Sequence, residues 1–196
     1  SVPDGVIIPG EVMQKIKDSG REVELNYGDY SWIITGFDVD YTAKPIDLRI
    51  MRVAESNWAE AVKTASGHLY KMQISIQHSG DFGFTALLKL NLSDGKPANP
   101  GTYYANLYQL SGDQLKWSVY SDLAEESGKY IAKLEFTHAS DWLVTIDSEI
   151  NPGSGNDGGS TGGSGNRVNG IKKARTLKSE GWDNIVKEIK STGEGS

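Results

Sequence analysis

Residues 69–92 read LYKMQISIQHSGDFGFTALLKLNL and carry the clearest structural signal in the chain. In residues 69–77 the apolar side chains occupy every second position, which is the period of a strand with one buried face. The next residues, HSGDFG, are typical of a turn. Apolar residues then alternate again from Phe84 to Leu92. This stretch therefore predicts two antiparallel strands that share one hydrophobic face.

Similar runs on both sides of this stretch extend the pattern. They predict strands at residues 22–25, 31–35, 48–53, 102–110, 114–121, 129–137 and 142–147. Short helices are predicted at residues 10–19, after Pro9, and at residues 57–66. About eight or nine short strands, with two or three short α-helices, indicate a mostly β protein with an antiparallel β-sandwich fold.

The parity of the alternating runs predicts which side chains face inward. The predicted core consists of Leu25, Met72, Ile74, Ile76, Leu88, Leu90, Leu115, Leu134, Phe136 and Val144. Residues 122–128 form an acidic segment that includes Glu125 and Glu126, and this segment is predicted to be a solvated loop.

Residues 151–166, NPGSGNDGGSTGGSGN, divide the chain. They have little apolar surface to bury, so a flexible Gly/Ser linker is predicted after a β-sandwich domain of residues 1–150. In the last part, residues 167–196, one apolar stripe recurs at helical spacing and consists of Trp182, Ile185, Val186 and Ile189. A single short helix is unstable in water, so this amphipathic helix is expected to dock back onto the β-sandwich.

Composition excludes several classes of function. The chain has 196 residues, a net charge of −6 and no cysteine. Disulfides, thiolate metal sites and cysteine catalysis are therefore excluded. No basic patch is interleaved with aromatic residues, so nucleic acid is not an expected partner. No apolar run reaches the ~18 residues of a membrane span and no signal peptide is recognisable, so membrane insertion is not expected.

Two turns place a histidine near a serine and an aspartate: His78 with Ser79 and Asp81, and His138 with Ser140 and Asp141. Sequence neighbours on a tight turn seldom reach the geometry of a Ser-His-Asp triad, and such residues commonly satisfy backbone groups. The spacing of these histidines and His68 matches no metal-ligand motif. The sequence therefore predicts no catalytic residues, no metal site and no cofactor.

The aromatic residues of strands 102–110 and 114–121 are the candidate ligand-binding residues. If Leu115, Trp117 and Val119 point inward, Tyr120 points outward, because successive side chains alternate between faces. An exposed aromatic row can stack on the C–H faces of sugar rings. The candidates are Tyr104, Tyr108, Tyr120 and Trp117. Alternatively, they are ordinary cross-strand pairs that stabilise the sheet.

Longer motifs suggest a family. Two segments together resemble the opening of a module in exported, multi-modular surface proteins of Gram-positive anaerobic bacteria, if the last segment of the chain is placed before the first. These are residues 181–196, GWDNIVKEIKSTGEGS, followed by residues 1–36, SVPDGVIIPGEVMQKIKDSGREVELNYGDYSWIITG. HSGDFGFTALLKLNL (78–92) and LEFTHASDWLVTID (134–147) resemble the middle and end of that module. The resemblance implies an extracellular or cell-surface location and brings no catalytic residues.

The order of these motifs differs from the family, because the helix that opens the module comes last here. The chain is either circularly permuted, naturally or by design, or cut from a tandem array at the first helix of the next repeat. A flexible tether of about 16 residues reaches roughly 20–25 Å, comparable with the width of such a domain, so the geometry permits permutation, and the order of the module's motifs favours it. A monomer is then expected, whereas a helix that inserts into a neighbour would give a domain-swapped oligomer.

Three hypotheses of function follow. The first is a non-catalytic extracellular binding or adhesion module that holds a polysaccharide or cell-wall glycan on exposed sheet aromatics. The second is a purely structural spacer of a cell-surface protein. The third, a glycan-active enzyme fragment, has the least support, because no carboxylate stands in a recognisably apolar cleft.

Overall fold

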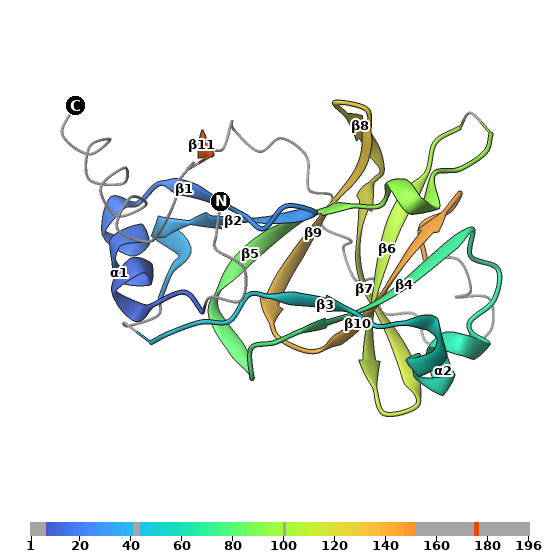
Figure 1. Ribbon diagram of the computed structural model, residues 1–196, viewed down its shortest axis with the longest axis horizontal. Coiled ribbons are helices and arrows are strands. Elements are labelled where there is room, and N and C mark those ends of the chain that lie inside the picture. Colours follow the sequence, from blue (N-terminus) through green and yellow to red (C-terminus); the bar gives the residue numbers. More distant parts are fainter. Residues whose placement is uncertain (1–6, 41–43, 100, 152–174, 177–196) are drawn as a thin grey trace, which may run out of the picture.

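The computed structural model describes residues 7–40, 44–99, 101–151 and 175–176, which form two facing β-sheets (Figure 1). The six-stranded sheet has the order β11 (Arg175–Thr176), β1 (Glu22–Asn26), β2 (Tyr30–Thr35), β5 (Asp81–Asn91), β9 (Lys129–His138) and β8 (Ala124–Glu126). The five-stranded sheet has the order β3 (Ile50–Arg52), β4 (Tyr70–Ile76), β10 (Asp141–Asp147), β6 (Tyr104–Ser111) and β7 (Gln114–Asp122).

Strand pairing in both sheets is antiparallel, except that β11 runs parallel to β1. The mostly β fold predicted from the sequence is confirmed, with α1 (Gly10–Ser19) and α2 (Glu60–Thr64) as its described α-helices. Figure 1 shows these helices at opposite ends of the molecule. The linker after Asn151 and the amphipathic helix at residues 181–191 lie outside the described residues.

The main core fills the space between the sheets. At its centre lies Trp32, which is fully buried and whose indole N–H donates to the Leu48 carbonyl at 2.8 Å. The rings of Phe82 and Phe136 meet it edge-on, with centroids 6.1 and 5.5 Å away. Of the predicted core residues only Leu115 is misplaced, since it is half-buried outside this cluster.

Helix α1 closes one end of the core with Val12, Met13 and Ile16, as its predicted apolar face requires. It ends at Gly20, which adopts the left-handed conformation with φ of 59°. The second predicted helix is shorter than expected, because Glu55–Asn57 forms a 3₁₀ turn before α2 begins. Likewise, the strand predicted at residues 48–53 is regular only over β3.

The prediction of a loop at residues 122–128 is wrong. After β7 the chain crosses to the other sheet, where β8 pairs with β9. The hairpin turn is Ser127-Gly128, and both residues have positive φ, 52° and 77°. A two-residue turn of this kind matches the twist of the strands but usually contains Asn or Asp before Gly. Serine at that position weakened the sequence signal for the hairpin.

Candidate functional site

The outward face of the five-stranded sheet holds all four aromatic residues predicted to bind a ligand. We call it the aromatic face. It includes Tyr104, Asn106, Tyr108 and Leu110 of β6, Leu115, Trp117 and Tyr120 of β7, and Leu143, Thr145 and Asp147 of β10. Strand register sets these residues side by side: Tyr108 pairs with Trp117, and Asn106 pairs with Tyr120.

A β-bulge in β7 decides which residues reach this face. The register shifts between Leu107, which pairs with Val119, and Tyr108, which pairs with Trp117, so that Ser118 is the extra residue. Val119 therefore packs against the main core, whereas Trp117 packs on the outward side. The expectation that Leu115 and Trp117 point inward is wrong for this reason. Tyr120 points outward, as expected, because it follows Val119 directly.

The four aromatic residues differ in how open they are. Tyr104 and Tyr120 are half-buried, and their rings meet nearly perpendicularly, 6.0 Å apart and at 81°. Trp117 is also half-buried, and its indole N–H donates to Asn106 Oδ1 at 3.3 Å. Tyr108 is only 7 % exposed. Tyr104, Tyr120 and Trp117 can therefore offer ring surface to a ligand, whereas Tyr108 serves packing.

Helix α2 explains the burial of Tyr108. A second hydrophobic cluster forms beneath this helix, with Val62, Tyr108 and Leu143 buried at its centre. Burial, together with the charge of Asp147, raises the pKa of the Tyr108 hydroxyl well above its usual range. Among the described residues, that hydroxyl has no hydrogen-bond partner.

Two side chains of β4 fasten α2 to the sheet. Gln73 Oε1 accepts the Ala59 N–H at 2.9 Å, before the helix begins. Lys71 Nζ donates to the carbonyls of Val62 and Ala65, at 2.8 and 2.7 Å, near its end. A helix of one turn leaves most of its backbone groups without internal partners, so these bonds hold it in place. Sequence parity alone expects Lys71 and Gln73 in solvent.

A buried polar network, which the sequence did not reveal, lies beside the aromatic residues. The Asp147 carboxylate is 2 % exposed and accepts hydrogen bonds from His68 Nδ1 at 2.8 Å and Asn106 Nδ2 at 2.9 Å. The oxygen that accepts from Asn106, Oδ2, also accepts a hydrogen bond from the Thr145 hydroxyl. Asn106 in turn bonds to the backbone of Glu149. The network therefore anchors the chain where it leaves β10.

The polar spacing of Thr145 and Asp147 was the available signal for this network, since both occupy outward positions of a strand. His68 comes from a separate loop, 79 positions earlier in the sequence. Its ring lies 5.8 Å from that of Tyr108, in an edge-on contact. With a buried carboxylate that accepts several hydrogen bonds and a buried imidazole, the arrangement is suited to holding the fold together.

Among the described residues, the other two histidines do not form the serine and aspartate contacts that a triad needs. His78 packs on Phe82, with centroids 5.8 Å apart. His138 lies on Trp142 and bonds through its ring nitrogens to Gln109 and Thr137, at 3.0 and 3.2 Å. Among the described residues, no group of three His, Cys, Asp or Glu side chains could hold a metal ion.

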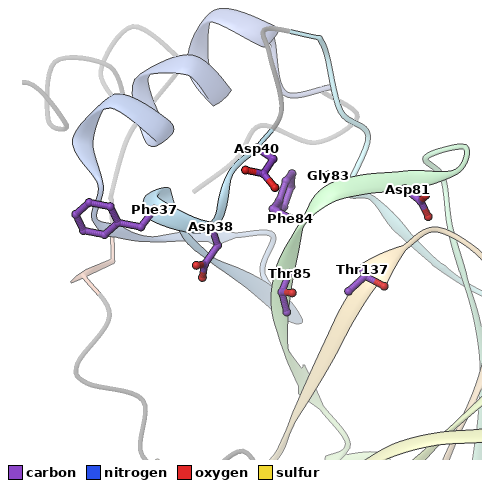
Figure 2. Close-up of a pocket in the computed structure, with 8 residues that line it drawn as sticks. All are labelled: Phe37, Asp38, Asp40, Asp81, Gly83, Phe84, Thr85 and Thr137. Carbon is purple, nitrogen blue, oxygen red and sulfur yellow. The ribbon is translucent and has the colours of Figure 1, made fainter.

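An open hollow of about 640 Å³ lies at one end of the six-stranded sheet (Figure 2). It is lined by Phe37, Asp38, Asp40, Asp81, Gly83, Phe84, Thr85 and Thr137. The ring of Phe37 is 85 % exposed and lies against Gly20. In Figure 2, Asp81 lies far from Asp38 and Asp40, so these carboxylates do not converge on one point.

The outward face of the six-stranded sheet carries ion pairs, and we call it the ion-pair face. It includes Glu24 of β1, Ser31 and Ile33 of β2, Leu87 and Lys89 of β5, Lys133 and Glu135 of β9, and Glu126 of β8. Lys89 lies 3.6 Å from both Glu24 and Glu126, and Lys133 also pairs with Glu126. Glu126 therefore bridges strands and is not the freely solvated residue that was predicted.

No family model matches this chain, and neither a curated protein nor a solved structure matches it. The resemblance to bacterial surface-protein modules, with its rearranged order, thus stays a prediction. Over the part of the chain that the structure describes, no helix has the length and apolar character needed to cross a membrane.

Proposed function

We propose that the protein is a non-catalytic, extracellular binding module that holds a carbohydrate on its aromatic face. The observation that carries this proposal is the corner formed by Tyr104 and Tyr120, two half-exposed rings in perpendicular contact on an outward sheet face. A sugar ring can stack its C–H face on one tyrosine while the edge of the other limits its position. Trp117, farther along β7, extends the apolar surface for a longer chain.

The surroundings of this corner support a polysaccharide ligand. Asp122, opposite Tyr104 on β7, is exposed and can accept hydrogen bonds from sugar hydroxyls. Beside the rings, Asn106 pairs with Tyr120 and Asp147 with Tyr104, and the buried network fixes both polar side chains, so the platform is rigid before binding. A preorganised site loses less conformational entropy when it binds a ligand.

The test is binding of the full chain to a panel of plant and bacterial cell-wall polysaccharides, measured by affinity electrophoresis. We expect retardation by at least one polysaccharide and its loss in Tyr104→Ala and Tyr120→Ala. Tyr130→Ala is the matched control, because Tyr130 is also half-buried but lies on the other sheet, beside Lys96. Melting curves establish that each variant is folded.

Two outcomes would contradict the proposal. If no polysaccharide retards the folded protein, the alternative of a structural spacer in a surface protein is favoured. If retardation persists in both tyrosine variants and falls in Phe37→Ala, the ligand binds in the hollow of Figure 2 instead.

A further inference from the structure

The ion-pair face contains an apolar pair that belongs to neither hydrophobic cluster. Ile33 of β2 and Leu87 of β5 are paired in register and point outward. They are only 6 and 7 % exposed. Both described α-helices pack elsewhere, α1 in the main core and α2 on the aromatic face. The described residues therefore place two buried aliphatic side chains on an outward face without a layer above them.

The register of β11 brings the C-terminal part of the chain to this face. Thr176 pairs with Glu24, Glu24 with Ile33, and Ile33 with Leu87, so the four residues form one row across the sheet. Neighbouring strands lie about 4.8 Å apart, which places the Thr176 backbone roughly 10 Å from that of Ile33. The chain beyond Thr176 therefore starts at the edge of the ion-pair face.

The sequence beyond Thr176 has the length and pattern needed to cover the apolar pair. Residues 177–181 can span up to roughly 17 Å, which is enough to reach either aliphatic side chain. A helix over residues 181–191 would be about 16 Å long, which is close to the roughly 20 Å length of the six-residue strand β2 that carries Ile33. Its apolar stripe consists of Trp182, Ile185, Val186 and Ile189.

We propose that residues 177–196 dock across the ion-pair face as a helix, with this apolar stripe over Ile33 and Leu87. The flanking charges of the face, Glu24, Lys89 and Lys133, would then surround the apolar contact at the rim. This docking closes one outward face of the sandwich with the chain's own end. The aromatic face remains as the open surface for a ligand.

Paramagnetic labelling of the full chain tests this docking directly, because the protein has no cysteine and a single one can be labelled. A nitroxide on Lys187→Cys should remove the methyl NMR signals of Ile33 and Leu87. The methyl signals of Leu110 and Leu143, on the aromatic face, should keep their intensity. Lys63→Cys, at an exposed position of α2 on the aromatic face, is the matched control and should give the reverse pattern.

Two results would overturn the proposal. In the first, the signals of Ile33 and Leu87 keep their intensity with the nitroxide at position 187, so that the C-terminal segment does not cover this face. In the second, those signals are lost when the nitroxide and the NMR labels are carried by different chains in a mixed sample. The occupant would then be a second copy of the chain, as in a domain swap.

Discussion

The aromatic face and the ion-pair face obey the same strand alternation but treat their polar residues differently. On the aromatic face, α2 and the chain after β10 cover the strands, and Asp147 is buried among hydrogen-bond donors. On the ion-pair face, Glu126 and Lys133 remain about one-third exposed and bridge neighbouring strands. A side chain at an outward strand position is therefore exposed to solvent only where no other element packs above it.

The largest effect is expected when one leucine from each of three layers is truncated to alanine and the losses of unfolding free energy are compared. Leu88 lies in the main core, Leu143 beneath α2, and Leu87 on the ion-pair face. We expect Leu→Ala to cost about 4 kcal/mol at Leu88, about 2–3 at Leu143 and about 1–2 at Leu87. The cavity beneath a one-turn helix can collapse more easily than one between two sheets. Urea unfolding measures the three losses of unfolding free energy. An equal loss at Leu87 and Leu88 would show that the ion-pair face is packed like a second core.

Asp147→Ala should cost about 3 kcal/mol of unfolding free energy. The substitution leaves buried donors on His68, Asn106 and Thr145 without their acceptor, and unsatisfied buried groups are costly. Asp141→Ala is the control, since Asp141 is exposed at the start of the same strand and should change stability by less than about 0.5 kcal/mol. Equal effects of the two substitutions would mean that the buried network contributes nothing to stability.

Glu126→Gln should have a smaller effect that depends on pH. The Lys133 ammonium, with help from Lys89, holds the pKa of the Glu126 carboxyl below its usual range. A lowered folded-state pKa stabilises the protein above the unfolded pKa of about 4.3, and this contribution disappears as the pH falls through the folded-state value. Screening of this partly exposed residue should keep the loss at pH 7 below about 1 kcal/mol.

Chemical unfolding at pH 7 and pH 3 measures this difference. The exposed neighbour Glu125 is the control, and Glu125→Gln should change stability little at either pH. The effect of Glu126→Gln should also shrink in 1 M salt, because screening weakens exposed pairs. A loss for Glu126→Gln that is larger at pH 3 than at pH 7 would contradict the assigned sign.

The smallest effect is expected for the predicted Gly/Ser linker of residues 151–166. Replacing residues 155–165 with another Gly/Ser sequence of equal length should change the unfolding free energy by less than about 0.5 kcal/mol, because composition alone sets the reach of such a linker. The melting temperature measures this change. A clear fall would show that specific side chains of the linker contribute to stability.

Regular alternation made much of the fold predictable from the sequence. Residues 69–92 gave β4 and β5 with their buried face, and the apolar spacing after Pro9 gave α1. These signals are local, because they depend on which side chains share a face. The candidate site was predictable only in part: strand alternation placed Tyr120 outward and Tyr104 was among the candidates, but Tyr108 was also expected in the exposed aromatic row, and α2 buries it.

The sequence by itself determined the mostly β class, the strands and most of the core, since the period of two in a strand follows from backbone geometry. Tertiary structure alone decided three features. The bulge at Ser118 directs the Trp117 side chain to the outward face of the sheet, and the crossing at Leu123 lets the acidic segment pair as β8. A long-range contact joins His68 to Asp147. The His68–Asp147 contact joins residues 79 positions apart, and the bulge and the crossing depend on how the strands pair, which is fixed only when both sheets pack together.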